Sequence, residues 1–223
     1  MPRIARIIYV GYPHHIVQRG NNKQTVFFDD ADRQEYLKFL NKYADECGSK
    51  LNSYCLMKNH IHLLLNPQHE NSLSKTMQKL SLRYTQYINK KYKRTGRLWE
   101  CRFHSCVVEK EAYLWSVCRY IERNPVRAGI VKVPVQYKWS SAKANTTFDH
   151  QNKMVEPIWK DYIDRDEYSK FLNQRDDKDE IERIKKSSYS GVPAGSEQFI
   201  QNIAKELGIS LSRRKKGRPR KSG

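Results

Sequence analysis

Hydrophobic and polar positions along the first part of the chain predict a mixed α and β fold. Stretches in which apolar residues alternate or cluster indicate strands, whereas apolar residues that recur every three to four positions indicate amphipathic helices. The expected elements are, in order, a strand at 14–19, a helix at 31–47, strands at 51–57 and 60–65, a helix at 72–92, a strand at 105–108 and a helix at 110–124. We expect the last helix to close at Pro125, because the residue before a proline disfavours helical geometry.

The order of these elements indicates the fold class. Two strands separated only by Lys58 and Asn59 predict an antiparallel hairpin. Asp29 or Asp30 can cap the first helix, and Gly48 lies just beyond its end. The order strand, helix, strand, strand, helix, strand is that of a ferredoxin-like α+β fold, in which helices pack on an antiparallel sheet.

Composition divides the chain into three parts. Residues 1–145 hold the patterned elements and are expected to form one domain. Residues 146–186 are charged and loosely helical, which predicts a helical extension. Ser, Gly and Pro are frequent at residues 187–196, so residues 187–223 are expected to be a linker followed by a basic tail.

The charge balance points to a polyanionic partner. Lys and Arg total 42 against 24 Asp and Glu, which gives a formal charge of +18 and a pI near 9.7. Nucleic acid is the first candidate. A membrane is not expected, because no run of about 18 apolar residues occurs, and the N-terminus lacks the apolar stretch of a secretion signal. We therefore expect a cytoplasmic protein that associates with the nucleoid.

Candidate chemistry begins with His60 and His62. Residues two apart on a strand project from one face, about 7 Å apart, so both imidazoles can converge on a metal ion. The alternative is that both rings lie on a solvated sheet face. Tyr120 and Asn124 are four apart on the last helix, which places a hydroxyl and an amide on one side; alternatively, Tyr120 packs in the core and Asn124 only ends the helix.

Four stretches together resemble a known family. MKNHIHLLL, GRLWECRFHS and CRYIERNPVRAGIV, together with the opening GYPHHIVQRGNNKQTVFF, resemble the single-tyrosine transposases of the HUH class. The match is closer to the REP-associated tyrosine transposases, which are relatives of the insertion-sequence 200-like enzymes. It spans roughly residues 6–141 and occurs in the expected order, so it implies that residues 1–145 are a transposase catalytic domain.

The resemblance implies a role for each site residue. His60, His62 and Asn124 would hold Mg²⁺ or Mn²⁺, and Tyr120 would be the nucleophile that attacks a DNA phosphodiester. The products would be a 5′-phosphotyrosine and a free 3′-hydroxyl. Glu122 is a competing ligand, but two residues along a helix it faces about 200° away from Tyr120.

Basic and amide side chains suggest where DNA would bind. The candidates in the patterned region are Arg19, Asn21, Asn22, Arg83, Arg97, Arg102, Arg119, Arg123 and Arg127. Near the C-terminus, Arg218 and Arg220 lie in KGRPRK, which resembles an AT-hook that inserts into the minor groove. The alternative is a basic tail of nonspecific affinity.

These features predict an endonuclease and strand transferase that cleaves and rejoins single-stranded or hairpin DNA near repeated palindromic elements. The protein would act as a monomer or a homodimer. One alternative is a hairpin-binding regulator that has lost turnover. Another is a nickase of the replication-initiator or relaxase type, which uses similar chemistry.

Overall fold

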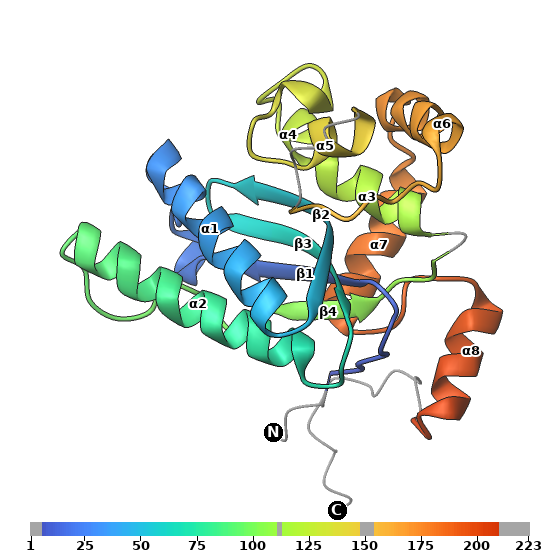
Figure 1. The fold of residues 1–223 in the computed structure, drawn as a ribbon, viewed down its shortest axis with the longest axis horizontal. Coiled ribbons are helices and arrows are strands. Elements are labelled where there is room, and N and C mark those ends of the chain that lie inside the picture. The colour runs from blue at the N-terminus through green and yellow to red at the C-terminus, as the bar shows by residue number, and fades with distance from the viewer. Residues whose placement is uncertain (1–5, 111–112, 148–153, 210–223) are drawn as a thin grey trace, which may run out of the picture.

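A four-stranded antiparallel sheet lies at the centre of the computed structural model, which describes residues 6–110, 113–147 and 154–209 (Figure 1). Its strands are β1 His14–Arg19, β2 Ser49–Met57, β3 His60–Pro67 and β4 His104–Val107, in the spatial order β2-β3-β1-β4. Helix α1, Asp30–Glu46, connects β1 to β2, and α2, Ser72–Lys91, connects β3 to β4. This connectivity gives the ferredoxin-like α+β arrangement predicted from the sequence.

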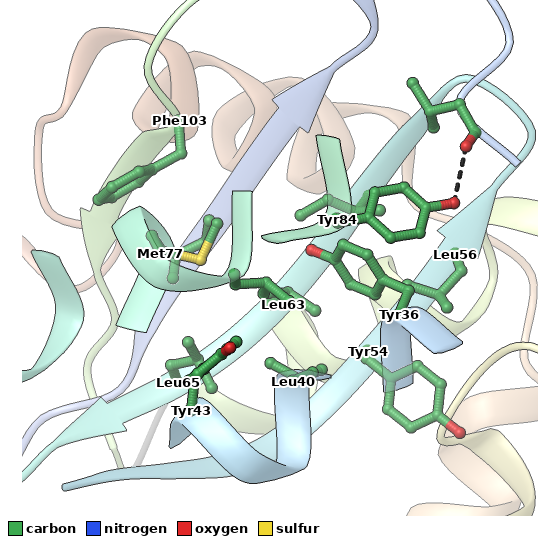
Figure 2. Packing of buried hydrophobic residues seen from close by; sticks show 14 of the residues in the cluster. Tyr36, Leu40, Tyr43, Tyr54, Leu56, Leu63, Leu65, Met77, Tyr84 and Phe103 are labelled. Atoms are coloured by element: carbon green, nitrogen blue, oxygen red, sulfur yellow. Dashed lines mark hydrogen bonds between the residues drawn. The ribbon is translucent and has the colours of Figure 1, made fainter. Parts of the chain in front are cut away.

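Helices α1 and α2 cover one face of the sheet. Alternation along β3 sends Ile61, Leu63 and Leu65 toward these helices, as expected, and all three side chains are fully buried. Aromatic rings from the helices fill the same layer, where the Tyr84 hydroxyl donates to the Val26 carbonyl at 2.7 Å (Figure 2). The sheet therefore has an apolar face that is closed by helices.

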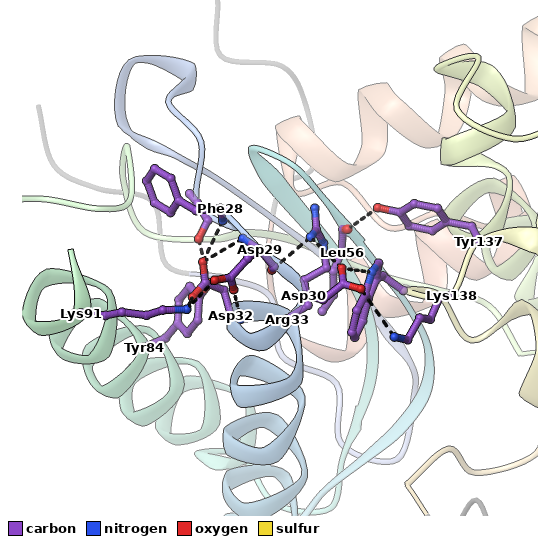
Figure 3. Close-up of polar contacts among 12 residues, drawn as sticks. Phe28, Asp29, Asp30, Asp32, Arg33, Leu56, Tyr84, Lys91, Tyr137 and Lys138 are labelled. Carbon is purple, nitrogen blue, oxygen red and sulfur yellow. Dashed lines mark hydrogen bonds and ion pairs between the residues drawn. The ribbon is translucent and has the colours of Figure 1, made fainter.

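Charged groups join the start of α1 to the end of α2 (Figure 3). Asp29 caps α1, as predicted, and forms a reciprocal capping box with Asp32. The Lys91 ammonium lies 2.8 Å from Asp29 and 2.7 Å from Asp32. Lys91 thus forms ion pairs within the protein and is not available for contact with DNA.

The opposite face of the sheet packs against the second half of the chain. Helices α3 Leu114–Glu122, α6 Tyr162–Asn173 and α7 Lys178–Ser190 contribute to one apolar cluster with residues of the sheet. That cluster includes Leu64 of β3, Val117 of α3 and Ile184 of α7. The charged extension expected beyond residue 145 is therefore helical and forms part of the cover of the sheet.

The predicted helix at 110–124 is interrupted near its end. Helix α3 ends at Glu122, and a separate short helix α4, Asn124–Arg127, starts after Arg123. Pro125 occupies the first turn of α4, where its missing N–H costs nothing. Pro125 thus lies in the first turn of a new helix, whereas the sequence predicted that it closes the preceding one.

The predicted linker at 187–196 is not a free connection. Residues 187–190 form the last turn of α7, and Ala194 pairs with Val108 beside β4. The Ala194 N–H donates to the Val107 carbonyl at 2.7 Å, and Glu109 accepts from Ser196. The small residues of 187–196 permit this close packing. A flexible linker would have the same composition, so composition alone could not distinguish the two.

Short elements complete the described chain. They are the 3₁₀ helices η1 Asn21–Lys23 and η2 Pro134–Gln136, α5 Ala142–Thr146 and α8 Glu197–Glu206. Arg218 and Arg220 of the AT-hook-like stretch lie outside the described residues. Among the described residues, no helix combines the length and apolar character needed to span a membrane.

His14 anchors the segment that leads into β1. Its ring is fully buried; Nδ1 donates to the Tyr12 carbonyl at 2.8 Å and Nε2 accepts the Tyr9 N–H at 3.2 Å. Burial lowers the pKa of His14 to about 4, because a charged ring would lose its hydration. The neutral ring is the form that fits this site.

Acid is therefore expected to destabilise the fold through His14. The pKa of His14 in the folded state lies below its unfolded value of about 6.5. The contribution of neutral His14 to the free energy of unfolding is therefore complete above pH 6.5 and is lost as the pH falls toward 4. The loss is about 1.4 kcal/mol per pH unit, or roughly 3 kcal/mol over the interval. Urea unfolding at about pH 7 and about pH 4.5 measures it.

Two variants assign the effect. His14→Gln should reduce the difference in unfolding free energy between the two pH values, whereas His69→Gln changes an exposed histidine and should not. An unchanged difference in His14→Gln would mean that other groups cause the acid sensitivity.

Candidate active site

The structure brings His60, His62 and Tyr120 together on the face of the sheet that α3 covers. The ring centroids of His60 and His62 are 5.1 Å apart, and that of Tyr120 is 5.6 Å from His62. His62 is 4% exposed and Tyr120 7% exposed, whereas His60 is half-buried. The alternative that both histidines lie on a solvated sheet face is therefore wrong. Tyr120 is buried, as the alternative of a core tyrosine predicted, but its ring packs against the imidazole of His62.

The Asn124 side chain folds back onto the last turn of the helix that carries Tyr120. Its amide nitrogen donates to the carbonyls of Tyr120 and Ile121 at 2.9 and 3.0 Å. Pro125 has no N–H to offer the Ile121 carbonyl, and the Asn124 side chain donates there in its place. With Nδ2 engaged in this way, Oδ1 is the amide atom that remains to act as a ligand.

Hydrogen bonds select which nitrogen of each imidazole faces the site. The Nδ1 of His60 is 2.7 Å from the amide oxygen of Asn59, which can only accept, so Nδ1 carries the hydrogen. The Nδ1 of His62 is 3.0 Å from the Nε2 of His15. In both rings Nε2 is the nitrogen left for a ligand.

Both imidazoles are held in the neutral form. Burial, followed by the nearby Arg19 charge, lowers the pKa of His60 to about 4. Burial also sets the pKa of His62 well below its ordinary value, and the His60 and His15 rings reinforce the shift. Neutral imidazole is the form that binds metal ions.

The donor set fits a divalent ion. Two imidazole nitrogens and one amide oxygen would leave coordination positions open for substrate oxygens. Within the described ranges, no group of three or more His, Cys, Asp or Glu side chains is arranged to hold a metal. The candidate set therefore depends on Asn124 as its third member.

Glu122 is excluded from this group by its position. It is fully buried and accepts hydrogen bonds from Ser53, Ser141, Asn145 and Tyr168 at 2.6 to 3.2 Å. Burial raises the pKa of Glu122, while these donors oppose the shift. Glu122 accepts the hydrogen bonds of a buried polar network on the side of α3 that faces away from Tyr120. Its position two residues after Tyr120 on the helix predicted this orientation.

His15 and Ser188 belong to the site but were not singled out from the sequence. His15 is fully buried between the His62 ring, 5.3 Å away between centroids, and the Ser188 hydroxyl, 2.7 Å from Nδ1. Strand alternation could have placed His15 on the same face as His62, because β1 and β3 are neighbours. For Ser188, on α7, the sequence carries no comparable signal.

Three of the predicted DNA-binding arginines form internal ion pairs instead. Arg119 lies 2.5 Å from Glu180, and Arg123 and Arg127 lie 2.9 and 3.4 Å from Asp176. Arg119 and Arg123 are buried, and Arg127 is half-buried. These pairs attach α3 and α4 to α7 and to the segment that leads into it, so in this structure the three arginines do not present a surface for DNA.

Arg127 also lies beside the candidate nucleophile. Its guanidinium is 4.6 Å from the centre of the Tyr120 ring, and it donates to the Tyr120 carbonyl. Burial raises the pKa of Tyr120 to about 12, and the Arg127 charge acts in the opposite direction. Arg127 is thus the cation placed to favour the phenolate.

The remaining predicted DNA contacts lie at the surface. Asn21, Asn22, Arg83, Arg97 and Arg102 are exposed, and Arg19 is half-buried.

Arg19 borders a small hollow beside His60. Cross-strand pairing places Arg19 opposite His60, so both side chains lie on the same face of the sheet. The hollow measures about 220 Å³ and is lined by Val17, Arg19, Glu100, Cys101, His104 and Tyr189. The Arg19 guanidinium donates to the Tyr189 hydroxyl at 3.1 Å, and the His104 ring lies 5.1 Å from that of Tyr189. Aromatic and basic groups therefore adjoin the histidine pair.

A fold and a site of this kind define a class of protein. The family model described as transposase, IS200-like, matches residues 9–124. That segment includes the whole sheet, both histidines and Tyr120. The chain belongs to the IS200-like transposase family.

Similar proteins within this class agree with the sequence motifs. A protein of Haemophilus influenzae named as a REP-associated tyrosine transposase is 23% identical over 135 residues, which cover 52% of this chain and 76% of that protein. The solved structure of a REP-associated tyrosine transposase bound to a REP hairpin is 17% identical with a TM-score of 0.57, and covers 73% of this chain and 93% of that chain. A transposase structure from Deinococcus radiodurans is 21% identical with a TM-score of 0.38, and covers 55% and 97%. The family model and the first two of these proteins confirm the predicted resemblance to REP-associated tyrosine transposases.

Proposed function

We propose that the chain cleaves and rejoins single-stranded or hairpin DNA through a covalent bond to Tyr120. The observation that carries the proposal is the packing of the Tyr120 ring against His62, within a site that also contains His60 and Asn124. A buried tyrosine beside two neutral imidazoles and a cation is suited to phosphoryl transfer. Family membership supports the same chemistry.

The covalent step is a displacement at phosphorus. The Tyr120 oxygen forms a bond to the scissile phosphorus, and the bond from phosphorus to the 3′ oxygen breaks. The phenol gives up one proton and the leaving 3′ oxygen gains one, so the step is balanced. Reversal by a 3′-hydroxyl restores the phosphodiester and frees Tyr120, and no nucleotide cofactor is consumed.

The proposed cofactor is Mg²⁺ or Mn²⁺. When bound, the ion would supply a Lewis acid that polarises the phosphate. His60 and His62 would hold it through Nε2 and Asn124 through Oδ1, which are the atoms that the internal hydrogen bonds leave available. Arg127 would stabilise the charge that develops on Tyr120.

The proposed substrate is DNA with a hairpin next to a single-stranded segment. Two observations support this choice: the charge of +18 and the REP hairpin bound by the structural neighbour. Arg83, Arg97 and Arg102 are exposed and can contact phosphates. Arg19 and Tyr189 would receive the unpaired strand beside the histidine pair.

The test is a search for the covalent intermediate. Labelled hairpin oligonucleotides from the flanks of the gene are incubated with the protein, with or without Mg²⁺ or Mn²⁺, and separated on a denaturing gel. We expect an adduct that requires the ion, and mass spectrometry of its digest should place the nucleotide on the peptide that contains Tyr120. Addition of a 3′-hydroxyl fragment should then yield a joined strand.

Other outcomes would select a different function. Cleavage without an adduct would make water the nucleophile and would remove the role assigned to Tyr120. Tight hairpin binding without cleavage of any tested strand would favour the regulator. An adduct that never yields a joined product would favour a nickase of the initiator type.

Tyr189 allows a separate test of the path of the DNA strand. Its ring is 47% exposed at the hollow, and stacking of a base on an aromatic ring contributes about 1 to 3 kcal/mol. Tyr189→Ala should therefore weaken binding of a hairpin with an unpaired flank by roughly 5- to 150-fold. Fluorescence anisotropy measures this, and Tyr189→Phe, which keeps the ring, should bind nearly as wild type.

The DNA itself supplies the control. Binding of the hairpin without its unpaired flank should respond little to Tyr189→Ala. An equal loss with both oligonucleotides would show that Tyr189 does not receive the flank.

A further inference from the structure

We propose that Ser188 and His15 are positioning residues that fix the tautomer of His62 and so prepare its Nε2 as a ligand. The inference rests on the proposed function of His62 in metal binding. It adds to the site a residue of α7, which lies outside the segment matched by the transposase family.

The proposal follows from a continuous chain of short contacts. The His62 Nδ1 lies 3.0 Å from the His15 Nε2, and the His15 Nδ1 lies 2.7 Å from the Ser188 hydroxyl. The Ser188 hydroxyl lies 2.7 Å from the Ile184 carbonyl oxygen, one turn earlier in α7. His15 and Ser188 are 0% and 1% exposed, so water does not substitute for these partners.

The Ile184 carbonyl at the end of this series of hydrogen bonds determines which atom donates in each of them. A carbonyl oxygen only accepts, so a separation of 2.7 Å between two oxygens requires the Ser188 hydrogen to lie between them. Ser188 must then accept from the His15 Nδ1–H. The His15 Nε2 is left as an acceptor, and it takes the hydrogen from the His62 Nδ1.

If each of these hydrogen bonds ran in the opposite direction, His62 could not bind an ion through Nε2. If His15 donated from Nε2, the hydrogen of neutral His62 would move to its Nε2, and that nitrogen could not bind an ion. The Ser188 hydroxyl would also turn toward His15 and leave two oxygens facing each other at 2.7 Å. The observed geometry therefore favours the ligand-ready tautomer of His62, which is the usual task of groups that support a metal ligand.

Cys106 is the other group at Ser188. Its sulfur lies 3.9 Å from the Ser188 oxygen and is a weak donor, so it can use the second lone pair of that oxygen. It does not compete for the Ser188 hydrogen. The contact agrees with the direction that the carbonyl imposes.

The test compares two neighbouring serines of α7. Ser188→Ala removes the anchor, whereas Ser187→Ala makes the same chemical change at a half-buried position of the same helix turn. Mn²⁺ is titrated calorimetrically into each full-length protein without DNA. Loss of a group that supports a ligand typically weakens metal affinity 10- to 100-fold, so we expect about that loss for Ser188→Ala and less than about twofold for Ser187→Ala.

A second readout needs no metal. The ¹⁵N shifts of the imidazoles distinguish the two tautomers, and His62 should carry its hydrogen on Nδ1 in the wild type and in Ser187→Ala. In Ser188→Ala the hydrogen of His62 should redistribute toward Nε2. A purely structural serine would leave this spectrum unchanged, and Ser188→Cys, which nearly keeps the volume, should give an intermediate shift if Ser188→Ala does not fold.

The outcomes separate this inference from the proposed function. Unchanged His62 shifts in Ser188→Ala and Ser188→Cys would overturn the inference. If His62→Ala binds Mn²⁺ as tightly as wild type, the proposed metal site fails, while the tautomer spectra still decide the role of Ser188. A shifted tautomer together with weakened Mn²⁺ binding supports both.

Discussion

Tyr120→Phe is expected to abolish the covalent DNA adduct and to lower strand cleavage by at least about 10³-fold, equivalent to about 4 kcal/mol of activation free energy. The change removes only the oxygen that is proposed to form the bond to phosphorus. The ring contacts to His15 and His62 remain, as does the Arg127 guanidinium over the ring. Hairpin binding and the thermal midpoint should therefore stay close to the wild-type values.

Single-turnover cleavage and anisotropy on the same oligonucleotide measure the two effects. Tyr12→Phe is the matched control, because it also removes one tyrosine hydroxyl. Tyr12 is half-buried and packs on Tyr9 and on Phe199 of α8. It should cleave as wild type. If Tyr120→Phe cleaves at an undiminished rate, another nucleophile carries the reaction.

Glu122→Ala is expected to lower the free energy of unfolding by about 3 to 5 kcal/mol. Four donors converge on this buried carboxylate, and its removal would leave Ser53, Ser141, Asn145 and Tyr168 without their acceptor. Urea denaturation at neutral pH measures the change. The loss would be a stability effect, with no direct role in the reaction.

Glu122→Gln separates stability from chemistry. The amide keeps one acceptor oxygen for Ser141 and Asn145, and its NH₂ group can donate to the Tyr168 hydroxyl. It also avoids burying a charge, whose cost is evident in the raised pKa of Glu122. We expect unfolding within about 1 to 2 kcal/mol of wild type and normal adduct formation. Loss of the adduct in a folded Glu122→Gln protein would instead make this carboxylate part of the reactive site.

Local patterns predicted the sheet and the histidine pair well. β1 has the predicted bounds, and alternation along β3 correctly separated His60 and His62 from Ile61, Leu63 and Leu65. These properties depend on residues within a few positions of one another. The periodicity of α3 similarly predicted that Glu122 faces away from Tyr120.

Features that depend on distant residues could not be predicted in this way. The arginines around Tyr120 resembled a DNA-binding surface because their acidic partners come much later in the sequence: Glu180 lies 61 residues after Arg119, and Asp176 lies 53 residues after Arg123. Ser188 lies in a segment whose composition suggested a linker. Its importance comes from packing against His15, and no sequence period connects the two positions.

The three ion pairs between Arg119, Arg123, Arg127 and the acids Asp176 and Glu180 fix the position of the helix that carries Tyr120. Any movement of the Tyr120 helix away from α7 would first have to break these desolvated pairs, which is costly. The pairs thus hold Tyr120 of α3 against His62 of the same chain. Under the proposed mechanism one Tyr120 faces each histidine pair, so two strand ends would be cut one after the other at the same centre.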